Sequence, residues 1–148
     1  MRVIQAPHST AGTTNTVFLA GSIEMGKAIK WQDEIIEKCK DTDITFFNPR
    51  RDDWDDSWEQ SITNEKFRKQ VEWELRSLNK ANKIVMYFDK DSLSPITLLE
   101  LGLHARADNL CVCCPDGYWR KGNVEIICEK YHIPMVETID ELVTFIKE

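Results

Sequence analysis

The sequence predicts an α/β protein built on a doubly wound parallel sheet with helices on both faces. Short apolar runs, typical of strands buried on both sides, lie at residues 16–20, 44–47, 83–88 and 110–114, with a weaker run at 134–136. Segments of helical length and spacing alternate with them, at residues 28–40, 63–81, 95–107, 123–131 and 139–146. Five β-α units in succession predict a flavodoxin-like or Rossmann-like sheet of about five strands.

Length and composition bound the organisation of the chain. The 148 residues suffice for one core, and no Gly/Ser-rich linker or internal repeat divides them. We therefore expect a single domain over residues 1–148, with 1–14 as a flexible or edge segment. No apolar run approaches the ~20 residues that a membrane span requires, and the N-terminal stretch has no secretory h-region. A cytoplasmic location is expected.

Charge and cysteine usage exclude some classes of function. The net charge of −6 disfavours a nucleic-acid polymer as partner, because such binding depends on clustered Lys and Arg. A small anion remains possible. The five cysteines lack the paired spacing of a zinc site, so we expect reduced, packed thiols and neither a metal nor a cofactor; they stand at 39, 111, 113, 114 and 128.

The loop after the first long strand is a candidate ligand site, since ligands bind beyond the carboxyl ends of parallel strands. Gly21, Ser22 and Gly26 in the stretch FLAGSIEMGK could let backbone N–H groups approach an anion or a sugar. The stretch is neither GxGxxG nor a Walker A loop, because Lys27 is followed by Ala28. A turn that needs glycines for backbone reasons alone is the alternative.

The segment FNPRRDDWDDSWEQ follows the second long strand and resembles a lid. It is too polar for a core and too aromatic for a solvated turn. Tryptophan faces can stack on a nucleobase, and arginines can hold a carboxylate or phosphate, although they could simply neutralise the neighbouring aspartates. Calcium is a weaker alternative because the acidic residues lack the alternating frame of a calcium loop. The candidate binding residues here are Asn48, Arg50, Arg51, Asp52 and Trp54.

A carboxylate, Glu100, stands in the otherwise apolar stretch SPITLLELGLHAR. Ser94 is a plausible N-cap and Pro95 a favourable first helical residue. At 100° per residue, Glu100 shares one narrow arc with a threonine and a histidine, while leucines fill most of the circumference. The pattern predicts a largely buried helix whose polar stripe faces a cleft. The alternative is an exposed glutamate paired with His104.

These motifs resemble the nucleoside 2-deoxyribosyltransferase superfamily, which includes the deoxynucleoside 5′-monophosphate N-glycosidases. The resemblance rests on FLAGSI, on Ser-x-x-Thr-x-x-Glu-Leu-Gly at 94–102, and on an acidic residue eight positions before Asn82. It extends from about Phe18 to Gly102. NPRRDDWD and WRKGNV make the chain similar to the less characterised deoxyribosyltransferase-like branch.

The resemblance implies roles for the two acidic residues. Glu100 becomes the nucleophile that attacks the anomeric carbon, and Glu74 corresponds to a residue that contacts sugar hydroxyls or the base. A carboxylate suits this chemistry because positive charge develops on the sugar when an N-glycosidic bond breaks. The leaving base also needs a proton donor, for which Glu74, Asp52 and Asp53 are candidates.

The resemblance also bears on phosphate and on assembly. Ser94 stands where the monophosphate hydrolases carry a serine that contacts phosphate. Glu24, however, stands where those hydrolases carry a phosphate-binding arginine, so phosphate recognition would fall to Ser22, Lys27 or the arginines at 50 and 51. Relatives often complete the site with polar residues of a neighbouring subunit, which makes Asn123 a candidate and implies a homodimer or higher homo-oligomer.

The expected function is therefore cleavage or transfer of the N-glycosidic bond of a (deoxy)nucleoside or nucleoside 5′-monophosphate. Hydrolysis and base exchange both remain open. A non-catalytic nucleotide-binding or sensing module of the same fold is the alternative. A flavodoxin-like electron carrier is a further rival, but AGSIEMGK is a poor match to its Ser/Thr-rich phosphate loop.

Overall fold

A computed structural model describes residues 1–24 and 27–148 of the chain. Within these residues the strands form a single parallel sheet of six in the order β1-β3-β2-β4-β5-β6. The predicted α/β class and the parallel sheet are confirmed. The strands are β1 (Arg2–Gln5), β2 (Thr16–Gly21), β3 (Thr45–Asn48), β4 (Lys83–Tyr87), β5 (Leu110–Cys113) and β6 (Met135–Val136).

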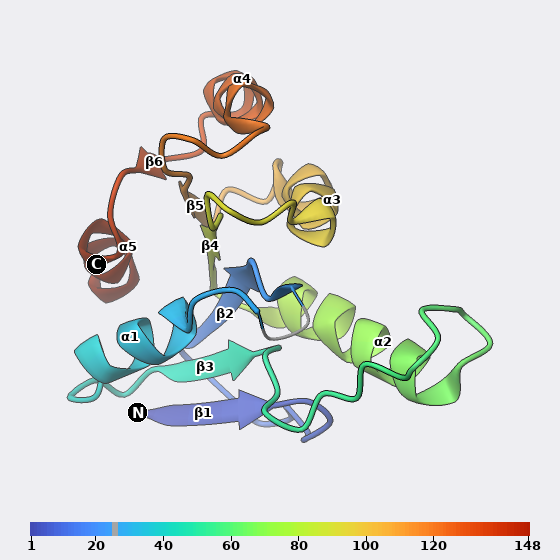
Figure 1. Ribbon diagram of the computed structural model, residues 1–148. Helices are drawn as coiled ribbons and strands as arrows, with labels where there is room; N and C mark the ends of the chain where they lie inside the picture. Colours follow the sequence, from blue (N-terminus) through green and yellow to red (C-terminus); the bar gives the residue numbers. More distant parts are fainter. Residues whose placement is uncertain (25–26) are drawn as a thin grey trace.

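Helices cover both faces of the sheet (Figure 1). Helices α1 and α5 share one hydrophobic core, and α2, α3 and α4 contribute to the other. Successive strand residues alternate between the two cores, as a pleated strand buried on both sides requires: Val17 enters one and Phe18 the other. The helices are α1 (Trp31–Lys38), α2 (Glu65–Lys80), α3 (Pro95–His104), α4 (Lys121–Tyr131) and α5 (Ile139–Lys147).

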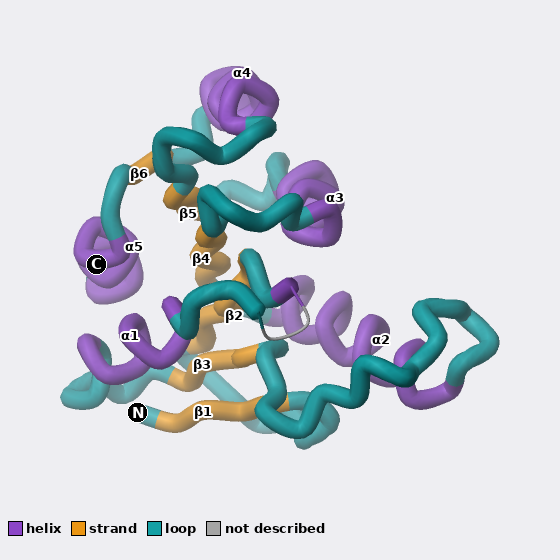
Figure 2. Tube along the Cα trace, in the orientation of Figure 1, coloured by secondary structure: helices purple, strands orange, loops and turns teal. Residues whose placement is uncertain are grey.

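The sheet has one strand more than the sequence pattern predicted. Residues Arg2–Gln5 form the edge strand β1, which pairs with β3 from Arg2 opposite Thr45 to Gln5 opposite Asn48. Without this added edge, the order β3-β2-β4-β5-β6 is that of a flavodoxin-like fold, with its topological switch point between β2 and β4. The tube in Figure 2 follows these strands through the centre of the molecule. The fold therefore directs attention to the carboxyl ends of β2 and β4.

The cysteines pack as the sequence predicted. All five are free and buried. Cys111 and Cys113 belong to one core and Cys114 and Cys128 to the other, so they do not converge on one point. Burial raises the pKa of Cys111 to about 12, which keeps that thiol protonated and unreactive at neutral pH. Across the described ranges, no helix combines the length and apolarity that a membrane crossing demands.

Candidate active site

The switch point begins at Gly21, the last residue of β2, which lies opposite Tyr87 of β4. Gly21 has a φ of +148°, and an added Cβ would come 2.8 Å from the Trp31 ring and closer still to the backbone of Tyr87. This glycine therefore serves the close packing of β2, β4 and α1. Trp31 seals the corner by donating its ring N–H to the Ser22 carbonyl at 3.0 Å.

Three buried serine hydroxyls gather just beyond the two strands. Ser22 Oγ is hydrogen bonded to Ser94 Oγ, and it accepts from Ser92 Oγ at 3.0 Å and from the Asp89 amide at 2.8 Å. Ser92 and Ser94 are also hydrogen bonded to each other. The cluster thereby ties the loop after β2 to the loop between β4 and α3. Sequence reasoning missed Ser92, which no motif marked.

Ser94 takes the position that the sequence predicted but not the predicted bond. It immediately precedes α3, yet its hydroxyl makes no capping hydrogen bond to the helix. Its backbone is left-handed, with φ 48°, and this turns the side chain into the serine cluster. Ser94 is thus the N-cap residue that the sequence predicted, but its hydroxyl bonds to Ser22 and Ser92 and not to a helix amide. The Ser94 amide instead donates to Glu24 Oε1 at 2.9 Å.

The polar stripe of α3 faces inward. Thr97, Glu100 and His104 are all buried, with Glu100 only 8% exposed. Burial, with the nearby charge of Glu74 as a second cause, raises the pKa of Glu100 to about 8. The alternative of an exposed Glu100 is thereby excluded. Burial also lowers the pKa of His104, which favours its neutral form.

Glu74 of α2 is the second member of a carboxyl pair with Glu100. Burial raises the pKa of Glu74 to about 6, against the opposing effect of a hydrogen bond from Gln70. That bond, from Gln70 Nε2 to Glu74 Oε1, is 2.8 Å long. Two carboxyl groups whose pKa values differ in this way can divide the roles of nucleophile and proton carrier. The fold thus brings together two acidic residues that lie 26 positions apart in the chain.

Gln70 links this pair to the loop after β3. It is 3% exposed, and its side-chain amide also donates to the Pro49 carbonyl at 3.2 Å. Its carbonyl oxygen accepts from Arg51 Nη1 at 3.4 Å. Sequence reasoning missed Gln70. The signal that was present is its i, i+4 spacing to Glu74 on one face of α2.

The Arg50 side chain points into the protein, where it bonds to groups before and within α1. Its guanidinium donates to the carbonyls of Ala28 at 2.7 Å and Ile29 at 2.8 Å, and to Gln32 Oε1 at 3.3 Å. Asn48 Oδ1 accepts the Arg50 amide at 3.0 Å. These bonds hold the segment before α1 against the end of β3, so Arg50 serves to position this segment.

The rest of the predicted lid, residues 51–58, packs largely on itself. Arg51 forms a bidentate pair with Asp53, both N–O distances being 2.9 Å, and this pair lowers the pKa of Asp53. Arg51 also lies over the Trp58 ring at 5.6 Å, and the Trp54 ring packs against Trp58 at an interplanar angle of 56°, with ring centroids 5.2 Å apart. Asp52 is exposed and pairs with Lys30 at 3.4 Å. Of the three candidate acids, Asp52 and Asp53 are thus engaged at the surface.

The outer side of α3 corrects the prediction of a largely buried helix. Ile96, Leu99 and Leu103 are each 58–59% exposed. Because successive residues turn by about 100°, this apolar strip lies next to the Glu100 stripe on the helix circumference. Only some of the leucines of α3 therefore pack in the core.

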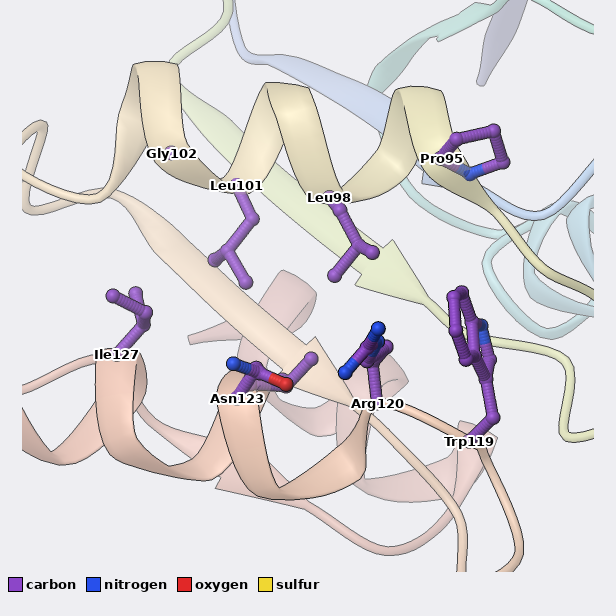
Figure 3. Close-up of a pocket in the computed structure, with 9 residues that line it drawn as sticks. Pro95, Leu98, Leu101, Gly102, Trp119, Arg120, Asn123 and Ile127 are labelled. Carbon is purple, nitrogen blue, oxygen red and sulfur yellow. The ribbon is translucent and has the colours of Figure 1, made fainter.

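Asn123 lies in a groove between α3 and α4 (Figure 3). The groove has a volume of about 530 Å³, and Leu98 and Leu101 point into it from α3. These leucines lie on a different side of α3 from Glu100. Within a single copy of the protein, Asn123 therefore does not lie beside the carboxyl pair. Trp119 and Arg120 line the same groove, with the guanidinium 4.3 Å from the ring. Gly26, the other predicted loop residue, lies outside the described residues.

Comparison with known proteins decides the family. The model of the family described as "Nucleoside 2-deoxyribosyltransferase like" matches residues 14–118. The chain belongs to this family. The match contains Glu74, Glu100 and the serine cluster, and membership in the nucleoside 2-deoxyribosyltransferase-like family implies glycosyl transfer on small nucleosides.

A solved structure supports the fold of this family member. The crystal structure of a conserved protein from Enterococcus faecalis V583 superposes with a TM-score of 0.61 at 11% identity, covering 89% of this chain and 96% of that one. At such identity the likeness concerns the fold alone. A search of curated proteins gives no match.

Proposed function

We propose that the protein cleaves the N-glycosidic bond of a nucleoside, with Glu100 as the nucleophile and Glu74 as the proton carrier. The observation that carries the proposal is the carboxyl pair of buried Glu100 and half-buried Glu74, with pKa values raised to about 8 and about 6. Perturbed carboxyl groups in a fold's ligand-binding crevice are typical of catalytic acids and bases.

The pair supplies both halves of the reaction. Between about pH 6 and about pH 8 the pair holds one proton, which lies mainly on Glu100 because that group has the higher pKa. The reactive form is the tautomer with this proton on Glu74: ionised Glu100 attacks C1′, the C1′–N bond breaks, and the electron pair of that bond goes to the base nitrogen. Glu74 in its protonated form delivers the proton that lets the base leave neutral. The glycosyl ester on Glu100 is then opened by water or by the nitrogen of a second base, while Glu74 takes up the proton from that nucleophile.

Gln70 is the positioning residue for Glu74 in this scheme. Its hydrogen bonds to Glu74 and to the Pro49 carbonyl fix the carboxyl group relative to the end of β3. The loop at residues 51–58 offers the aromatic surface for the base. Trp54 suits this role because its ring N–H is buried without an acceptor among the described residues, so a ligand group can satisfy it.

A second copy of the chain covers the outer face of α3 in this proposal. Monomeric proteins rarely expose such contiguous apolar surface. The strip lies next to the Glu100 stripe, so a partner there stands close to the nucleophile and can bring its own Asn123 toward it. The exposed apolar side chains on and beside α3 and α4, each 55–69% exposed, are Leu93, Ile96, Leu99, Leu103, Trp119 and Ile126.

A base-release panel tests the proposal against the non-catalytic alternative. The protein is incubated with purine and pyrimidine nucleosides in ribo and deoxy forms, and free base is followed by chromatography. A second free base added to the mixture separates exchange from hydrolysis, because only exchange produces a new nucleoside. We expect turnover of at least one nucleoside. Saturable binding of nucleosides without any base release would instead identify a sensing module.

A further inference from the structure

We propose that Glu24 is a specificity-determining residue that excludes a 5′-phosphate, so that the site takes nucleosides and rejects their 5′-monophosphates. The inference rests on the proposed function, since it concerns the other end of the same substrate. It reverses the expectation drawn from Ser94, that the site accepts phosphate.

A carboxylate of the chain itself already occupies the start of α3. The Glu24 carboxylate accepts the Ser94 amide at 2.9 Å, directly before the first residue of the helix. Free N–H groups and the positive end of the helix dipole make this the position where a phosphate would be held. Both residues adopt left-handed backbones, with φ 47° and 48°, which non-glycine residues rarely do. An anion supplied by the chain itself already stands where a substrate anion would bind.

Negative charge also surrounds the serine cluster. Asp89, 9% exposed, follows β4 and donates its amide to Ser22 Oγ at 2.8 Å. Its carboxylate accepts the amides of Asp91 at 3.0 Å and Ile29 at 3.4 Å. The hydroxyls that would contact a phosphate are thus flanked by two carboxylates, Glu24 and Asp89. They also already satisfy one another.

The neighbouring cations Arg50, Arg51 and Lys30 are bound to other groups of the chain. Arg50 donates to the carbonyls of Ala28 and Ile29, and Arg51 is held in a bidentate pair by Asp53. Lys30 pairs with Asp52. Each of these cations therefore already has anionic or carbonyl partners of its own. Lys27 is exposed and lies on the same loop as Glu24.

Glu24 lies at the start of α3, ahead of Glu100 along the same helix. Ser94 and Glu100 are six residues apart, which is about 9 Å along a helix. The span from C1′ to the 5′ oxygen of a nucleoside is shorter, so in the proposed pose the side chains of Glu24 and Glu100 bridge the difference. In that pose C1′ lies at Glu100 and the 5′ group points toward the Glu24 carboxylate. A neutral 5′-hydroxyl can donate to this carboxylate, whereas a phosphate is repelled by it.

The experiment compares one deoxynucleoside with its own 5′-monophosphate. The ratio of the two kcat/KM values is measured for wild type, Glu24→Gln, Glu24→Arg, Lys27→Gln and the distant control Glu37→Gln. Wild type should prefer the nucleoside by at least about tenfold, because like charges brought together disfavour a ligand strongly. Glu24→Gln should reduce this preference and Glu24→Arg should reverse it. Lys27→Gln and Glu37→Gln should leave it unchanged.

Binding to Glu100→Gln, measured by calorimetry with the same two ligands, separates this inference from the proposed function. Preferred binding of the nucleoside, lost when Glu24→Arg is added, supports the inference even where no base is released. A monophosphate that binds or reacts as well as the nucleoside overturns the inference alone, as does a ratio unaffected by both Glu24 variants or a ratio governed by Lys27. Failure of both ligands to bind overturns the inference together with the proposed function.

Discussion

The two sides of α3 reverse the usual arrangement of a surface helix. On the inner side, Thr97, Glu100 and His104 are 3–8% exposed, while on the outer side Ile96, Leu99 and Leu103 are 58–59% exposed. A helix that only contributed to the core would place its leucines inward and its carboxylate outward. Both sides therefore cost stability in an isolated chain, one by burying a carboxyl group and the other by exposing apolar area.

In the proposed function this reversal lets the two sides of α3 serve different ligands. The buried carboxyl group is useful only if a substrate meets it, and the exposed apolar strip is stabilised only if another surface covers it. α4 behaves differently: its buried residues, Val124 and Cys128, are apolar and simply join the core. Four predictions sharpen or break the comparison between the two sides of α3.

The largest effect is expected from Glu100→Ala. Loss of the nucleophile should reduce base release by at least about 10³-fold, since truncated nucleophiles leave only residual catalysis. The fold should persist, because truncating a buried carboxyl group leaves the leucine packing in place. Chromatographic base release and circular dichroism check the two statements. Unchanged activity would remove Glu100 from the mechanism.

Glu74→Gln should have the next largest effect, a loss of about 10²–10⁴-fold in kcat/KM. In wild type the pair loses one proton near pH 6 and the second near pH 8, and the singly protonated pair is the reactive form. Wild-type kcat/KM should therefore peak between these values and fall on both sides.

The Gln variant keeps the hydrogen-bonding shape but has one titrating group, so its profile should retain a single limb. Glu72→Gln, on the same helix and paired with Arg68, is the control and should keep both limbs. A bell-shaped profile that survives in Glu74→Gln would contradict the assignment of Glu74.

Leu99→Glu addresses the outer side of α3. A charge placed in a buried apolar interface should weaken self-association by at least about tenfold, because the group must be desolvated without a partner. Light scattering after size exclusion should detect a dimer for wild type and a monomer for the variant. Leu75→Glu, an equally apolar-to-charged change on α2, should remain dimeric. A monomeric wild type would show that the strip does not join two copies.

The smallest effect concerns stability at high pH. Burial raises the pKa of Glu100 to about 8, above its ordinary value of 4.5. The contribution of Glu100 to stability is therefore fully present below its ordinary pKa and is lost as pH rises through about 8. Glu100→Gln stays neutral, so at about pH 9 it should melt at least about 5 °C above wild type. The gap should nearly vanish at about pH 5. An equal gap at both pH values would indicate a packing effect instead.

Local pattern alone was enough to predict the strands and helices of the core. The runs at 16–20 and 83–88 are apolar after their first residues, Thr16 and Lys83, as expected for strands covered on both faces, and they became β2 and β4. The edge strand β1 was left undecided because a four-residue strand with two exposed residues at its start carries little pattern of its own. The pairing of β1 with β3 is a long-range event that only the folded sheet provides.

The candidate site was predictable in part. The motif around Glu100 and the spacing of Glu74 placed both carboxyl groups, because strand order brings α2 and α3 to the same face of the sheet. The hydrogen-bond partners were not predictable. Ser94 bonds to Ser22 and Ser92 instead of capping its helix, and Arg50 bonds to carbonyls of residues 28–29. Such partners are distant in sequence and are selected by the geometry of the packed loops.

The sequence by itself determined the α/β class, the parallel arrangement of buried strands, and the presence of one carboxylate in an apolar helix. These could be predicted because periodicity and side-chain polarity are local properties. Tertiary structure alone decided that Glu100 points inward while Leu99 points outward, and that Glu24 reaches the start of α3. The physical reason is that the core accepts only as much apolar surface as the sheet can cover. A helix with leucines on most sides must leave some exposed, and only packing selects which.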